Sequence, residues 1–64
     1  MKAILVRIDR LTEAIELGML TRSEALSMIR SIRNTIADKF EEGSDNFIQC
    51  IEYLIDANSI AQEL

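Results

Sequence analysis

FIQCIEYLIDANSIAQEL, residues 47–64, is the stretch that decides the fold, because it carries too many apolar residues for an ordinary surface helix. At about 100° per residue, these residues form two adjacent helical stripes. The first stripe holds Phe47, Ile51, Leu54, Asn58 and Ala61, and the second holds Cys50, Tyr53, Ala57, Ile60 and Leu64. A surface helix usually shows one such stripe. The pattern therefore predicts a helix that is wedged between two neighbours, one of which can belong to a second copy of the chain.

The length of the chain, 64 residues, predicts a single helical domain over residues 1–64. A chain of this size buries only about 60% of its unfolded surface, so its stability is marginal. Cys50 is the only cysteine and there is no histidine, which excludes a disulfide within the chain and disfavours a zinc site. Self-association is the stabilising device that remains, and we expect a homodimer.

Residues 2–17 are predicted to form the first helix. Ile4, Ile8, Leu11 and Ile15 recur at spacings of four, three and four, and Gly18 stands where a left-handed cap would end the helix. The segment KAILVRI, residues 2–8, is also rich in branched residues, so a short strand is the alternative there.

A capping box marks the start of the second helix, predicted over residues 22–42. Thr21 and Glu24 are spaced so that each side chain can bond to the backbone amide of the other residue. The core stripe that follows holds Ala25, Ile29, Ile32, Ile36 and Phe40, and Gly43 is the expected left-handed terminator.

The third helix is predicted over residues 45–63, with Ser44 or Asp45 as its N-terminal cap. Both connections are only a few residues long, and short loops make neighbouring helices antiparallel. The expected fold is therefore all-α, with three antiparallel helices in an up-down-up arrangement that is completed by homodimerisation.

The residue types that enzymes use are scarce in this chain. Without histidine there is no Ser-His or Cys-His pair, and the two glycines stand alone rather than in a phosphate-binding loop. Cys50 lies on an apolar stripe with no basic residue within a turn, which is typical of an inert buried thiol. The carboxylates of residues 41–46 lack the ligand spacing of a calcium loop. We expect no enzymatic activity, cofactor, metal site or small-molecule substrate.

Asn58 occupies a position in the first stripe where an apolar residue would be more stabilising. An asparagine at such a position can fix the register and the number of chains by pairing across an interface. The alternative is that the stripe is incompletely buried there and Asn58 contacts water. The predicted self-association interface is Phe47, Cys50, Ile51, Tyr53, Leu54, Asn58 and Ile60.

Exposed apolar and basic positions on the first two helices are the candidates for binding a different protein. The apolar candidates are Val6, Leu17 and Leu20, which could anchor a partner's helix. Arg22, Arg30 and Arg33 share one flank of the second helix and could contact an acidic partner. The leading hypothesis is a small helical adaptor or regulator that acts through protein–protein interaction.

Two segments resemble the ribbon-helix-helix DNA-binding proteins: VRID at residues 6–9 and GMLTRSEAL at residues 18–26. The resemblance covers roughly residues 2–36 and implies a dimeric transcriptional regulator in which residues 3–8 pair as an intermolecular strand. Two features depart from that pattern. Only residues 10–17 remain for the first helix, and the acidic third helix is additional.

The charge is divided unevenly along the chain. Residues 1–39 hold seven basic and five acidic residues, which nets +2, whereas residues 40–64 hold six acidic and no basic residues, which nets −6. An acidic chain makes nucleic acid an unlikely ligand, although the acidic half could mimic nucleic acid and inhibit a DNA-binding factor. The opening segment is too charged for a signal peptide and no run is long enough to span a membrane, so a cytoplasmic protein is expected.

Overall fold

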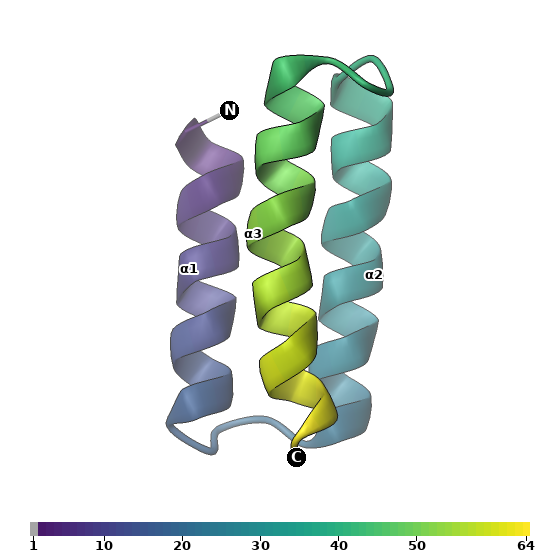
Figure 1. Cartoon of the computed structure of the whole chain (residues 1–64). Coiled ribbons are helices and arrows are strands. Elements are labelled where there is room, and N and C mark those ends of the chain that lie inside the picture. Colours follow the sequence, from purple (N-terminus) through teal and green to yellow (C-terminus); the bar gives the residue numbers. More distant parts are fainter. Residues whose placement is uncertain (1) are drawn as a thin grey trace.

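Three antiparallel helices form the whole fold in the computed structural model, which describes residues 2–64 (Figure 1). They are α1 (Lys2–Glu16), α2 (Arg22–Lys39) and α3 (Asp45–Gln62). The predicted all-α, up-down-up arrangement is confirmed. The alternative of a strand at residues 3–8 is wrong, because these residues lie inside α1.

The end of α1 is set by Gly18. This glycine has a φ of +72°, a left-handed conformation that costs other residues energy. The Gly18 amide donates to the carbonyl of Ile15 over 3.1 Å, and the Met19 amide donates to the carbonyl of Ala14 over 3.0 Å. These two bonds are the Schellman arrangement, so the predicted left-handed cap is confirmed.

The capping box predicted at the start of α2 is present. The Glu24 amide donates to Oγ1 of Thr21 over 3.1 Å, and the Thr21 amide donates to Oε1 of Glu24 over 3.0 Å. Two of the amides that would otherwise lack a partner at the helix start are thereby bonded.

The end of α2 differs from the prediction. The helix stops at Lys39 rather than near residue 42, and Phe40 adopts an extended conformation with φ −125° and ψ 145°. In this position the half-buried Phe40 side chain packs against the core. Gly43 does have a positive φ, +84°, but it belongs to the turn that precedes α3. Ser44 caps α3 by accepting from the Phe47 amide over 3.3 Å.

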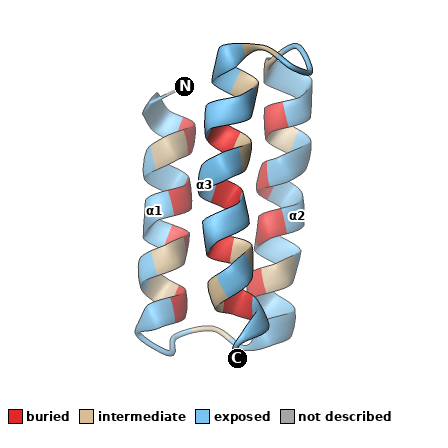
Figure 2. Cartoon of the chain, in the orientation of Figure 1, coloured by how far each residue is buried: buried red, intermediate tan, exposed pale blue. Residues whose placement is uncertain are grey.

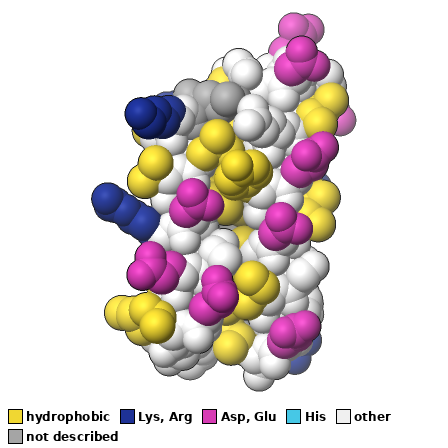
Figure 3. Space-filling view, turned by 60° about the vertical axis from the view of Figure 1, so that its left-hand side comes forward, with side chains coloured by type: hydrophobic (Ala, Val, Ile, Leu, Met, Phe, Trp, Pro, Cys, Tyr) yellow, Lys and Arg dark blue, Asp and Glu magenta, His cyan; other side chains and the backbone are white. Residues whose placement is uncertain are grey.

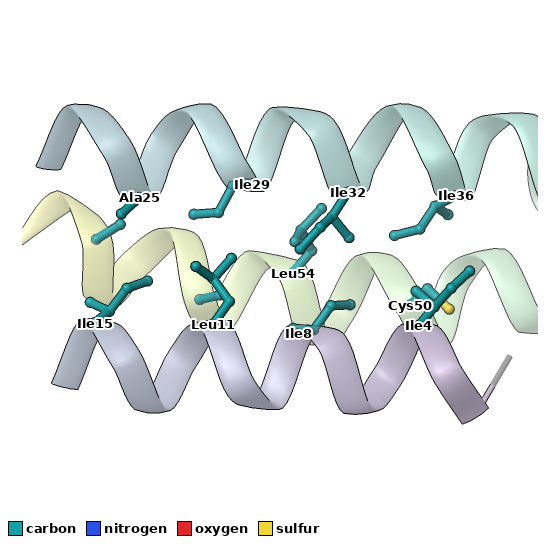
Figure 4. Close-up of a cluster of buried hydrophobic side chains, with 12 residues drawn as sticks. Ile4, Ile8, Leu11, Ile15, Ala25, Ile29, Ile32, Ile36, Cys50 and Leu54 are labelled. Carbon is teal, nitrogen blue, oxygen red and sulfur yellow. The ribbon is translucent and has the colours of Figure 1, made fainter. Parts of the chain in front are cut away.

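One apolar core runs along the middle of the bundle (Figure 2). The isoleucines and Leu11 of α1 point toward the isoleucines of α2, and α3 contributes Cys50 and Leu54 between them (Figure 4). The complete set of buried residues is Ile4, Ile8, Leu11, Ile15, Ala25, Ile29, Ile32, Ile36, Cys50, Leu54, Ala57 and Ala61. None of the described polar or charged residues is buried, so stability comes from apolar packing and capping.

The helix α3 is the central element, because it contacts α1 and α2 equally and more extensively than they contact each other. Its buried row is Cys50, Leu54, Ala57 and Ala61, which takes two members from each predicted stripe. The line between the two stripes is therefore what faces the core. Each remaining stripe member lies on a flank, and Phe47, Ile51, Asn58 and Ile60 are half-buried there.

Candidate interaction surfaces

Among residues 2–64, eight large apolar side chains remain at least 40% exposed, which is the feature that most needs a functional explanation. They are Val6, Leu17, Met19, Met28, Ile48, Tyr53, Ile55 and Leu64. Isolated exposed apolar residues are normal, but contiguous ones mark contact surfaces. Their distribution follows the three sides of the bundle.

The α1/α2 groove is a shallow depression of about 300 Å³ on the side where these two helices meet. It is lined by Ala3, Val6, Arg7, Arg10, Leu11, Ala14, Leu20, Met28 and Ile32. The two arginines are the only charged members of this lining, and both are exposed. An apolar floor with guanidinium groups beside it suits a ligand that is apolar and acidic.

The α2/α3 groove is larger, about 480 Å³. Its lining is Ile29, Arg33, Glu42, Phe47, Ile51, Leu54, Ile55 and Asn58. A smaller depression lined by Ala37 and Phe40 shares four residues with it, namely Arg33, Glu42, Phe47 and Ile51, so the groove continues toward the α2–α3 turn. Near the opposite end, Arg22 donates from Nη2 to Oε1 of Gln62 over 2.9 Å, which ties the start of α2 to the end of α3.

The acidic face covers the third side, between α1 and α3 (Figure 3). Since Arg7 and Arg10 line the α1/α2 groove, helical spacing puts Asp9 and Glu16 on the opposite flank of α1, toward α3. On α3, Glu52, Asp56 and Glu63 point away from the buried row. Acidic side chains surround an apolar patch over α1 and α3, and basic side chains appear only at the edge of this view (Figure 3).

The residues predicted for self-association are divided by the structure. Cys50 and Leu54 are only 0% and 4% exposed, so they belong to the chain's own core, although Leu54 also lies in the lining of the α2/α3 groove. Phe47, Ile51 and Asn58 line the α2/α3 groove. The other two lie on the flank of α3 that faces α1, where Tyr53 is exposed and Ile60 is half-buried.

The residues predicted to bind a partner fall on different sides. Val6 and the half-buried Leu20 line the α1/α2 groove. Leu17 is 66% exposed in the connection after α1. Arg33 lines the α2/α3 groove, while Arg22 and Arg30 lie exposed along α2 on the same flank.

Several exposed apolar residues were missed at the sequence level, notably Met28, Ile48 and Ile55. Met28 is 45% exposed and lines the α1/α2 groove. Ile48 and Ile55 of α3 are 46% and 57% exposed, and Ile55 lines the α2/α3 groove. Their angular distance from the buried row could have revealed them, because both lie more than a quarter turn away from it.

The thiol of Cys50 shows no sign of a reactive site. Its side chain is fully buried, and this burial raises the pKa of the thiol, which keeps it protonated. Among residues 2–64, no three His, Cys, Asp or Glu side chains come close enough together to hold a metal ion. No helix in the same range is long and apolar enough to cross a membrane.

Comparison of the chain with protein-family models, curated proteins and solved structures gives no match.

Proposed function

We propose that this chain is a small non-enzymatic adaptor or regulator that binds another protein and also associates with copies of itself. The observation that supports this proposal most directly is the exposed apolar surface beside the grooves. Val6 and Met28 line the α1/α2 groove and Ile55 lines the α2/α3 groove, and no polar or charged residue among residues 2–64 is buried. Exposed apolar surface next to charged side chains is typical of protein–protein contact sites.

The partner site in this proposal is the α2/α3 groove. Ile51 and Phe47 supply a half-buried apolar floor, and the exposed Ile55 extends it. Arg33 lies in the lining, with Glu42 at the end near the α2–α3 turn, and Arg30 is exposed one turn from Arg33 on the same helix. A partner helix with an apolar stripe and flanking carboxylates fits this combination, because helix-in-groove recognition uses apolar anchors and the arginines provide charge complementarity.

The self-association part of the proposal gives α3 a second role. Its Tyr53 side is exposed in the single chain, and a chain this small gains stability from assembly. The smallest assembly consistent with the proposal is a homodimer. Size-exclusion chromatography with light scattering measures this directly, and a strictly monomeric protein at high micromolar concentration would contradict it.

Partner binding is tested with two matched surface variants. A tagged chain is crosslinked in its native host, and the captured protein is then purified and titrated against the pure chain. We expect Ile55→Asp to abolish binding, because it places a carboxylate in the apolar part of the α2/α3 groove. The control Val6→Asp makes the same type of change in the other groove. Equal loss of binding in both variants, or in neither, would contradict the assignment.

The DNA-binding alternative loses its structural premise. A ribbon-helix-helix dimer needs residues 3–8 as an intermolecular strand, and here these residues form the first half of α1.

A further inference from the structure

We propose that copies of this chain associate head to tail, with the acidic face of one copy docked on the α1/α2 groove of the next. This inference rests on the proposed self-association and specifies its geometry. It concerns two surfaces that lie on different sides of the same bundle, so each copy can use both at once.

The receiving surface is the α1/α2 groove. The pair α1 and α2 has the least extensive contact of the three helix pairs, which leaves this side of the bundle incompletely closed. Val6 and Met28 remain 40% and 45% exposed over its floor. Arg7 and Arg10 lie three residues apart on α1, so their guanidinium groups flank the floor within one helical turn.

The docking surface is centred on Tyr53, the only tyrosine of the chain, which is 40% exposed on the flank of α3 that faces α1. Glu52 precedes it directly and Asp56 follows it within one turn. Asp9 of α1 lies on the facing flank of the other helix. Carboxylates therefore flank the aromatic side chain on both helices, and acidic groups gather on this side of the bundle (Figure 3).

The two surfaces match in apolar character and in charge. A projecting aromatic ring bordered by carboxylates meets an apolar groove bordered by guanidinium groups. Tyrosine and arginine are the residue types most often found at the energetic centre of interfaces. Arginine and carboxylate also form the strong, directional hydrogen-bonded pairs that fix register.

Charge also decides between head-to-tail and two-fold assembly. A two-fold contact through the acidic face would place carboxylates of one copy against those of its partner, and like charges across an interface are costly. A head-to-tail contact places opposite charges together. Such a contact uses two different patches, so it continues into open chains or closes into a ring of three or more copies.

Two charge-reversal variants each remove one surface. Arg7→Glu/Arg10→Glu disables the groove, and Glu52→Lys/Asp56→Lys disables the acidic face; all four residues are exposed, so the helical fold is kept. We expect each variant alone to be monomeric, with its dissociation constant for self-association raised about a hundredfold, because like-charge juxtaposition costs several kcal/mol. An equimolar mixture should form complexes again, because the retained acidic face of one variant meets the retained groove of the other, and the two reversed surfaces are also complementary in charge.

The control is Arg30→Glu/Arg33→Glu, which makes the same change of charge, from −4 to −8, on the α2/α3 flank. It should self-associate like the unmodified chain but lose the protein partner, whereas Arg7→Glu/Arg10→Glu should keep the partner. Failure of head-to-tail assembly is thereby distinguished from failure of partner binding. The unmodified chain should grow beyond two copies in sedimentation velocity, and less so as salt is added. A plateau at two copies, or no complex in the mixture, would overturn the inference.

Discussion

Thr21 and Glu24 exchange two hydrogen bonds at the start of α2. This pair is the clearest case in the chain of individual side chains that determine where a helix begins. The bond from the Thr21 amide, together with the Thr21 hydroxyl, lowers the pKa of the Glu24 carboxyl. The helix dipole also favours a carboxylate near the N-terminus of a helix. The ionised form of Glu24 therefore stabilises the folded state.

This lowered pKa predicts how stability depends on pH. The contribution of Glu24 is fully present above the ordinary glutamate pKa of about 4.3 and is lost as the pH falls through the lower folded-state value. The unmodified chain should be more stable than Glu24→Gln at neutral pH, and the difference should shrink in acid. Urea denaturation of both proteins at pH 7 and at about pH 3 measures it. A difference that does not change with pH would show that the charge of Glu24 is unimportant.

The helical stripe alone does not determine whether Asn58 is buried. The pattern predicted either a buried register-setting residue or a water-exposed one. The structure places Asn58 half-buried in the α2/α3 groove, with Ile29 and Arg33 among the other lining residues. Because the half-buried amide of Asn58 is still partly open to water, Asn58 destabilises the fold much less than an asparagine buried in the core would.

At the element scale, the buried rows of α1 and α2 could be predicted, because each of these helices shows one main apolar stripe. The stripe Ile4, Ile8, Leu11 and Ile15 is the buried row of α1 as expected. The capping residues of α2 and α3 could also be predicted, because each one bonds to a residue only three positions later in the sequence.

The buried row of α3 could not be predicted, because a helix with two neighbours shows two stripes and the core lies between them. Small residues at Ala57 and Ala61 occupy that line and let α3 approach both other helices. The early end of α2 was also missed. Phe40 leaves the helix to pack on the core, which is a tertiary effect without a local signal.

The position of Ala57 gives a prediction for α3. Its side chain is 0% exposed at the centre of the bundle, so Ala57→Leu must push α3 away from its neighbours. We expect the free energy of unfolding to fall by about 1–3 kcal/mol, as overpacking of cores typically costs. The control Ser59→Leu, exposed on the same helix, should change it by no more than about 0.5 kcal/mol. Chemical denaturation compares the two, and equal effects would mean that α3 is not closely packed.

At the scale of the whole molecule, the three helices share one core and should unfold together. The core draws residues from all three helices, and α3 contacts both others extensively. We therefore expect two-state unfolding, in which helicity measured by circular dichroism and the fluorescence of Tyr53 change over the same range of urea. Separate transitions for the two signals would show that the three helices do not unfold as one unit.

The interaction surfaces were less predictable than the core because they depend on how whole helices are placed. The sequence indicated that the chain is divided in charge, but helical spacing puts the acidic Asp9 and Glu16 of α1 on the flank that faces α3. The three sides of the bundle differ only once the helices are packed: one side is acidic, and each of the other two has a groove whose lining includes arginine. The predicted contact residues were thus distributed over three sides instead of forming one interface.

An odd number of antiparallel helices also has a mechanical consequence. Residues 2 and 64 lie at opposite ends of a body 32 Å long (Figure 1). Tension applied between them would run along the helix axes and load the α1–α3 contact in shear, so that many side chains must slip together. If such a bundle were linked to other domains at both ends, it would resist being stretched along its long axis.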